Sequence, residues 1–180
     1  MKTRTICAIT FCAVSWWNAT PAASAEFFGL GRVPGGEYIQ AWDLSSDGSV
    51  VVGRESRGEG WMPWRWTVET GLEILECGGY SRCSAIGVSG DGSVIVGKGG
   101  NVFAPPDQEA IRWTTASGME ILEILPGHGQ CGLHNVSDDG SVLAGWCDSV
   151  AVRWTESGIE SLGVPDPNRY NDSSVRADSI

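Results

Sequence analysis

The chain has 180 residues and a formal net charge of −10, with 19% charged residues, 25 glycines and 9 tryptophans. A disordered acidic tail would contain fewer aromatic and more charged residues, and a collagen-like chain would need glycine at every third position. The acidic balance also argues against nucleic acid or an anionic membrane surface as a partner. The composition therefore predicts a globular domain that is rich in turns.

Residues 1–25 are predicted to be a signal peptide that is removed on export. Lys2 and Arg4 form a positive start, residues 6–17 form an apolar run, and residues 23–25 match the small-x-small cleavage pattern. Cleavage leaves residues 26–180, which are 155 residues with a net charge of −12. No later apolar run reaches the roughly 18 residues that a membrane helix needs. We therefore expect a secreted, extracellular or periplasmic chain with no transmembrane segment.

One sequence unit recurs three times along the rest of the chain. Copies of Ser-x-Asp-Gly-Ser-Val-x-x-Gly begin near residues 44, 88 and 136, and their aspartates, Asp47, Asp91 and Asp139, lie 44 and 48 residues apart. Each copy is followed by Arg-Trp-Thr, by a glycine and by a short apolar segment. Periods of 20 to 50 residues are typical of solenoids, propellers and arrays.

Each unit is predicted to form four short antiparallel strands. Asp-Gly between apolar runs favours a hairpin, because glycine takes the positive φ of the turn, and a second hairpin follows Arg-Trp-Thr. One register places an apolar pair and an opposite-charge pair across this second hairpin in every copy. The predicted pairs are Trp66 with Leu72, Arg65 with Glu73, Trp113 with Met119, Arg112 with Glu120, Trp154 with Ile159, and Arg153 with Glu160. The arginines are thus interpreted as cross-strand partners and the tryptophans as core residues.

The expected fold is all-β, a β-propeller-like array of four-stranded antiparallel blades forming an incomplete ring. Residues 30–36 resemble the end of a unit and are expected to form a fourth strand without its own blade, and residues 175–180 resemble the start of a further hairpin. The array then has about three to three and a half blades, below the four to eight of closed propellers. We expect a fragment of a longer product, an open array, or a ring completed by a second copy, with self-association through open blade edges.

The repeat resembles the bacterial extracellular HAF repeat family. The resemblance rests on Ser-x-Asp-Gly-Ser-Val-x-x-Gly, then Ala-x-Arg-Trp-Thr, then Gly-Met-x-x-Leu, and it covers nearly all of residues 26–180. The family's His-Ala-Phe tripeptide is degenerate here, at residues 62–64, 109–111 and 150–152. The resemblance implies a secreted or cell-surface β-propeller-like protein and supplies no catalytic residues.

Four cysteines remain after removal of the signal peptide: Cys77, Cys83, Cys131 and Cys147. An exported chain permits disulfides, and four cysteines allow three pairings. A hairpin centred on Asp139 places Cys131 opposite Cys147, which favours that pairing and leaves Cys77 with Cys83.

We expect neither a metal site nor a cofactor. His128, Cys131 and His134 have a spacing that suggests zinc, but in an extended segment Cys131 and His134 point to opposite faces. Too few oxygen ligands are assignable for calcium. No catalytic residues are assigned either.

The connection between the second and third strands varies in length, and such insertions emerge on one face of a repeat protein, often the binding face. The candidate ligand-binding residues in these loops are Arg54, Arg57, Trp61, Lys98 and Phe103. An aromatic ring beside cationic groups suits stacking on a sugar or docking of an acidic polymer. The plain alternative is an ordinary solvated loop with a few exposed aromatic residues.

The function predicted from these features is that of a non-catalytic binding or structural module outside the cytoplasm. Its expected partner is an extracellular glycan or another surface protein. One alternative is a carbohydrate-active enzyme, either a glycosidase or a sialidase-like propeller. That chemistry needs two carboxylates in a cleft, or a tyrosine nucleophile with arginines. Another alternative is a non-functional fragment of a longer repeat protein.

Overall fold

The computed structural model describes residues 29–32, 34–101 and 108–163. Twelve β-strands and no helix occur in these ranges, so the described part of the chain offers no helix long and apolar enough to cross a membrane. The predicted signal peptide, residues 1–25, and the predicted partial repeat near residue 175 lie outside the described residues. The all-β prediction is confirmed.

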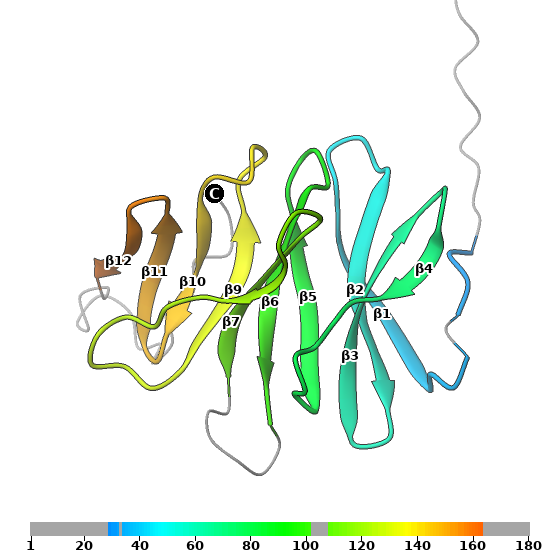
Figure 1. Cartoon of the computed structure of the whole chain (residues 1–180), viewed down its shortest axis with the longest axis horizontal. Coiled ribbons are helices and arrows are strands. Elements are labelled where there is room, and N and C mark those ends of the chain that lie inside the picture. The colour runs from blue at the N-terminus through cyan, green and yellow to red at the C-terminus, as the bar shows by residue number, and fades with distance from the viewer. Residues whose placement is uncertain (1–28, 33, 102–107, 164–180) are drawn as a thin grey trace, which may run out of the picture.

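The strands form three antiparallel blades of four strands each, in chain order (Figure 1). Blade 1 consists of β1 (Tyr38–Leu44), β2 (Val50–Arg57), β3 (Gly60–Thr67) and β4 (Gly71–Ile74). Blade 2 consists of β5 (Arg82–Val88), β6 (Val94–Gly100), β7 (Glu109–Thr114) and β8 (Gly118–Ile121). Blade 3 consists of β9 (Cys131–Val136), β10 (Leu143–Cys147), β11 (Val150–Thr155) and β12 (Gly158–Gly163).

The predicted register of the second hairpin is confirmed in all three blades. Trp66 faces Leu72 and Arg65 faces Glu73 across β3 and β4. The other four predicted pairs are also Cα partners: Trp113 with Met119, Arg112 with Glu120, Trp154 with Ile159, and Arg153 with Glu160. The alternation of apolar and charged residues therefore specifies which face of each strand is buried.

The Asp-Gly hairpin has the same polar construction in each blade. In blade 1 the Ser45 hydroxyl donates to Asp47 Oδ1 (2.7 Å), and that oxygen also accepts from the Ser49 N–H (2.9 Å). The Gly48 N–H donates to the Ser45 carbonyl (2.8 Å), and Gly48 has φ +72°. The loop thus holds four residues between Ser45 and Val50, because the turn begins at the serine and glycine closes it with a positive φ.

The glycine that ends the repeated motif is required by a close approach of two backbones. A Cβ built on Gly53 would lie 1.9 Å from the Gln40 carbonyl oxygen, and one built on Gly97 would lie 1.9 Å from the Ser84 carbonyl oxygen. Each first strand carries a β-bulge near this point, between Ala41 and Asp43 in blade 1. The bulge presses the first strand against the second, so no side chain fits there.

The hydrophobic core lies between blades. One cluster joins Val50 and Val52 of blade 1 to Val88, Ile95 and Trp113 of blade 2. A second cluster joins blades 2 and 3 in the same manner through Val96, Ala110, Val136, Leu143 and Trp154. Each blade therefore buries its face only against a neighbour, as expected of a stacked repeat.

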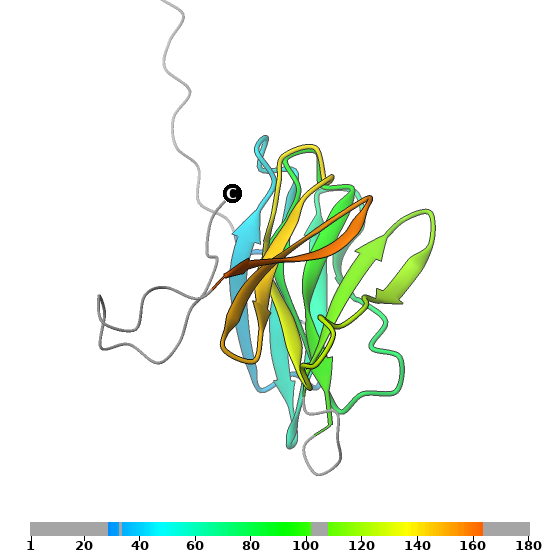
Figure 2. The same cartoon turned by 90° about the vertical axis from the view of Figure 1, so that its left-hand side faces the viewer.

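Polar contacts repeat at each junction between blades. Trp113 Nε1 donates to the Glu76 carbonyl (2.7 Å), and Trp154 Nε1 donates to the Glu123 carbonyl (3.0 Å). The three Asp-Gly turns lie along the upper edge of Figure 1 in cyan, green and yellow. They are joined there, because the Ser46 N–H donates to the Gly90 carbonyl (3.0 Å) and the Gly90 N–H to the Asp138 carbonyl (2.9 Å). Figure 2 views the same row from the side of blade 3.

The prediction of a fourth strand at residues 30–36 is wrong. The described residues of this segment form no strand, and β1 begins only at Tyr38. Its Pro34-Gly35 turn corresponds to Pro126-Gly127, which lies in the connection after β8, and the two glycines have φ +88° and +86°. The segment thus resembles a linker between blades, because proline cannot donate to a ladder and the glycine turns the chain away.

Candidate ligand-binding cleft

Four of the five candidate ligand-binding residues lie on strands rather than on loops, which corrects the expectation from the sequence. Arg54 and Arg57 lie on β2, Trp61 lies on β3, and Lys98 lies on β6. Strands β2 and β3 pair without a break as far as Arg57 and Gly60, because backbone hydrogen bonding continues through what reads as a loop in the sequence. Phe103 lies outside the described residues.

Three of the candidate residues meet at one cleft between blades 1 and 2. Arg54, Trp61 and Lys98 line a cleft of about 360 Å³. Its other lining residues are Arg82, Ser84, Gly99, Gly100, Asn101 and Gln108. The blades come together here through one parallel bridge, between Trp61 and Arg82. Strands from two blades thus bring together cations that are far apart in the sequence.

Arg54 is held between two indole rings. Its guanidinium carbon lies 3.9 Å from the ring centroid of Trp61 and 4.8 Å from that of Trp42. Arg54 Nε also donates to Gln40 Oε1 (3.1 Å), and this hydrogen bond restricts the orientation of the guanidinium group. Burial lowers the pKa of Arg54 from its ordinary value, although arginine stays charged. The two indole rings and Gln40 thus fix the position of a guanidinium that lines the cleft.

Two more cations complete the lining. Lys98 Nζ lies 5.8 Å from the ring centroid of Trp146, and Arg82 Nε donates to the Glu59 carbonyl (3.3 Å). Among the described residues, no carboxylate lines the cleft. The cleft is thus a locally cationic site on a chain whose net charge is −10, a charge distribution that focuses anions onto the site.

Arg57 has a different position from the other candidates. Its Nη2 lies 2.6 Å from Glu55 Oε1, and the Glu55 side chain is only 1% exposed. Arg57 does not line the cleft. A buried carboxylate needs a charged partner, so Arg57 stabilises β2, the strand that carries Arg54.

The connection between β4 and β5 leads directly to Arg82, one of the lining residues of the cleft. The disulfide Cys77–Cys83 closes this connection, with the two Cα atoms 6.0 Å apart. Tyr80 lies inside it and donates a hydrogen bond from its hydroxyl to Glu109 on β7. Burial raises the pKa of Glu109. These contacts anchor the connection that leads to Arg82, the first residue of β5 and a lining residue of the cleft.

Several residues of the site were not predicted from the sequence. Arg82 and Gln108 line the cleft, and Trp42 and Gln40 position Arg54. The hairpin register would have found Gln40, which is the Cα partner of Arg54 across β1 and β2. Arg82 and Gln108 belong to blade 2, and no spacing within one repeat unit indicates that they reach blade 1.

The second predicted disulfide is confirmed in blade 3. Cys131 and Cys147 are Cα partners across β9 and β10, and their disulfide spans 16 residues. Cys131 is therefore not available to a metal with His128, whose Nδ1 lies 3.1 Å from Asp148 Oδ2 instead. Within the described ranges, no group of three or more His, Cys, Asp or Glu residues is placed to hold a metal ion.

Two further grooves occupy equivalent places at the two blade junctions. One, of about 520 Å³, lies between blades 2 and 3 and includes Arg112, Leu122 and Trp154. The other, of about 120 Å³, lies between blades 1 and 2 and includes the corresponding residues, Arg65, Leu75 and Trp113. Because they recur at the same place in the repeat, these grooves belong to the way the blades stack.

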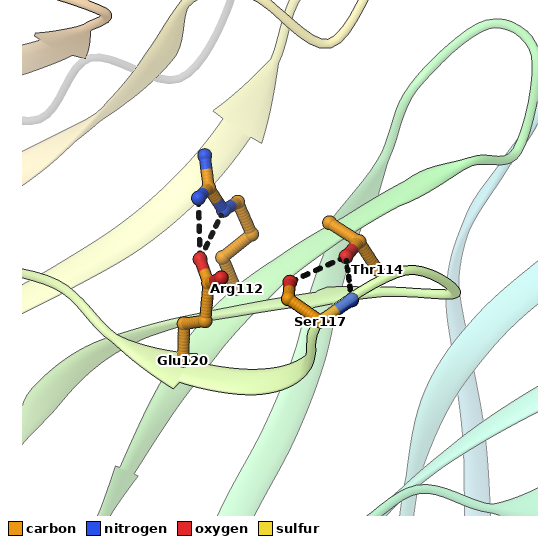
Figure 3. Close-up of polar contacts among 4 residues, drawn as sticks. All are labelled: Arg112, Thr114, Ser117 and Glu120. Atoms are coloured by element: carbon orange, nitrogen blue, oxygen red, sulfur yellow. Dashed lines mark hydrogen bonds and ion pairs between the residues drawn. The ribbon is translucent and has the colours of Figure 1, made fainter.

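Figure 3 shows the polar contacts of the second hairpin in blade 2. Arg112 donates to Glu120 Oε2 from both Nε, at 3.0 Å, and Nη2. The Ser117 N–H donates to the Thr114 hydroxyl oxygen (3.0 Å), which closes the turn. Hydrogen bonding by Ser117, followed by Arg112, lowers the pKa of Glu120. In blades 2 and 3 the repeated arginine is thus paired within its own hairpin.

Carboxylates of the repeated motifs are hydrogen-bonded within their own hairpins. Asp47, Asp91 and Asp139 each accept hydrogen bonds from the serines of their own turn. Glu120 and Glu160 pair with arginines across their hairpins. Glycoside hydrolysis needs two carboxyl groups facing one cleft, and the lining of the cationic cleft, as far as it is described, contains none.

Comparisons with known proteins bear on the fold. No protein-family model and no curated protein matches the chain. A solved structure of putative TolB from Agrobacterium tumefaciens has a TM-score of 0.53 at 15% identity, covering 71% of this chain and 50% of that one. TolB from Acinetobacter baumannii has a TM-score of 0.45 at 17% identity, covering 70% of this chain and 30% of that one. The chain thus spans half or less of these proteins. Its fold is that of an incomplete β-propeller.

Proposed function

We propose that this protein is an exported, HAF-like repeat protein that acts as a non-catalytic binding module and takes an acidic glycan in the cleft of Arg54, Arg82 and Lys98. One observation carries the proposal: a guanidinium oriented by two tryptophans faces a cleft that holds two more cations. The two disulfides suit an oxidising compartment outside the cytoplasm.

The position of Trp61 favours a charged sugar over a neutral one. A neutral sugar binds by laying its ring on a free aromatic face, whereas Arg54 lies over the Trp61 ring at 3.9 Å. A guanidinium presents parallel N–H groups that match a carboxylate, and stacking on indoles reduces the entropy lost on binding. Uronic acids, which carry one carboxylate on each sugar ring, provide the matching group.

The test is a titration of the purified chain with tetragalacturonic acid, and with maltotetraose as the neutral control. We expect the acidic tetrasaccharide to bind, to change the tryptophan fluorescence and to bind more weakly as salt increases. Arg54→Gln is expected to weaken binding roughly tenfold or more, since a charge-assisted pair is lost. The control Arg153→Gln removes an arginine of blade 3 that is paired with Glu160, and should leave binding unchanged.

Three results would overturn the proposal: equal binding of both tetrasaccharides, no effect of Arg54→Gln, or no binding of the acidic one. Selective binding of an acidic peptide instead would assign the cleft to a surface protein.

Chromatography of the incubated tetrasaccharide provides the test of catalysis. Cleavage that disappears on substitution of a single carboxylate would establish the alternative, a carbohydrate-active enzyme.

A further inference from the structure

The two outer faces of the blade row expose residues whose counterparts are buried between blades. Leu44 ends β1 and is 59% exposed, whereas the residues at the same position, Val88 and Val136, are 6% and 5% exposed. Trp66 and Val51 share this face of blade 1 and are half-buried. Their counterparts are buried against the preceding blade: Trp113 and Trp154 for Trp66, and Ile95 and Leu143 for Val51. Blade 1 thus presents its leading face, the face that in blades 2 and 3 packs against the preceding blade.

Blade 3 presents its trailing face, the face that in blades 1 and 2 packs against the following blade. Leu162 on β12 is 52% exposed. Its counterparts, Leu75 and Leu122, are partly buried and pack against the clusters that contain Trp113 and Trp154 of the following blade. The leucine that covers the tryptophan of the next blade is therefore exposed at one end of the row, as Leu162. The half-buried Trp66 and the exposed Leu44 lie at the other end.

The backbone hydrogen bonds between turns point to the same pairing. The chain of bonds runs from the Ser46 N–H to Gly90 and from the Gly90 N–H to Asp138. One more step of this pattern would join the Asp138 N–H to the carbonyl of a residue equivalent to Ser46. The leading face of blade 1 carries that carbonyl.

We propose that a second copy of this chain docks head to tail, with blade 1 of each copy seated on blade 3 of the other. Both internal junctions use one set of contacts, so the two outer faces are complementary by construction. Two copies supply six blades, within the four to eight of closed propellers. A head-to-tail contact closes into a ring when its rotation allows and otherwise grows into an open filament. The blade number favours closure.

The test is the mass of the full chain, produced with export and measured by light scattering in 0.15 M salt at a series of concentrations. We expect a dimer. Leu44→Lys and Leu162→Asp each place a charge in an apolar contact and should weaken the dimer roughly tenfold or more. The matched control is Ile121→Asp on β8 of the middle blade, which is 51% exposed and lies on neither outer face, and it should leave the dimer intact.

Mixing the two variants tests whether the contact is head to tail. A ring made from one Leu44→Lys copy and one Leu162→Asp copy contains one unaltered junction and one junction of opposite charges. The mixture should therefore dimerise more tightly than either variant alone, and this recovery also shows that both variants fold. A monomer at all concentrations would overturn the proposal. Dimers unaffected by either variant, or polymers that grow with concentration, would also overturn it.

Discussion

At the scale of single residues, the repeated serine, aspartate and glycine form the turns of the first hairpins. In each repeat, one serine and one aspartate close the first hairpin and a glycine completes it. Among the described residues, the carboxyl groups with the largest pKa shifts lie in these turns. Hydrogen bonds from the serines lower the pKa of Asp47 and of Asp139 from 3.8 to about 2. A lowered pKa here therefore reports a structural contact.

The turn aspartates predict a specific loss of stability in acid. Because the folded pKa of Asp47 lies near 2, below its ordinary value of 3.8, the ionised turn stabilises the fold fully above about pH 4. This stabilisation is lost as the pH falls from about 4 to 2. Thermal melting should show a drop in Tm over that window, and the drop should be smaller in Asp47→Asn. The exposed control Glu69→Gln should keep the drop of the unaltered chain, and equal drops in all three chains would contradict this account.

The motif-ending glycine predicts a severe effect from one methyl group. In Gly53→Ala the new Cβ would lie 1.9 Å from the Gln40 carbonyl oxygen and 2.6 Å from Trp64 Cζ2, and neither a ladder backbone nor a buried ring can move aside. We expect the free energy of unfolding to fall by about 1–3 kcal/mol. Urea unfolding followed by tryptophan fluorescence measures this loss. Gly129→Ala, which meets nothing within 4 Å, is the matched control and should stay within about 0.5 kcal/mol of the unaltered chain.

At the scale of elements, the hairpin is the unit that the sequence predicts best. Both hairpins of each blade were expected from local patterns, and the structure confirms the register of the second hairpin and the Cys131–Cys147 pairing. The same patterns failed where pairing extends beyond the motif. Residues read as a loop, among them Arg54 and Trp61, continue β2 and β3. A hairpin register depends on neighbours in the sequence, but strand length also depends on which blade lies alongside.

The two disulfides should differ in their contribution to stability. Cys131–Cys147 spans 16 residues and Cys77–Cys83 spans 6, so the first restricts the unfolded chain more. Replacing Cys131 and Cys147 by alanine should lower the free energy of unfolding by about 2–4 kcal/mol, and replacing the other pair should cost about 1 kcal/mol less. Urea unfolding of the two variants measures the difference. Mass analysis that finds four free thiols in the exported chain, or a larger loss at Cys77–Cys83, would contradict this prediction.

At the scale of the whole molecule, stability depends on the junctions between blades. Each core cluster contains residues of two blades, and each junction adds a tryptophan that donates to a carbonyl of the preceding blade. Exposed apolar side chains remain at both ends of the described row, Leu44 on blade 1 and Leu162 on blade 3. The head-to-tail dimer proposed above would bury these two outer faces against each other.

The tryptophan bonds at the junctions predict equal effects in two blades. Trp113→Phe keeps an aromatic ring but leaves the Glu76 carbonyl without its donor, and Trp154→Phe does the same to Glu123. Each substitution should lower the free energy of unfolding by roughly 1–3 kcal/mol. Chemical unfolding of both variants gives the comparison. A loss in one variant and none in the other would show that the two junctions are not energetically equivalent.

The sequence by itself determined the repeat, the all-β class, four strands in each blade, the cross-strand pairs and the likeness to an incomplete propeller. The strands and cross-strand pairs depend on residues a few positions apart, where side-chain alternation and turn chemistry decide the outcome, and the recurrence of the motif every 44 to 48 residues indicates the array. Only the tertiary structure placed Arg82 beside Arg54 and Lys98, laid Arg54 over Trp61, and directed Arg57 to Glu55. These contacts join different blades or depend on rotamers chosen within a packed junction, and no spacing within one repeat encodes them.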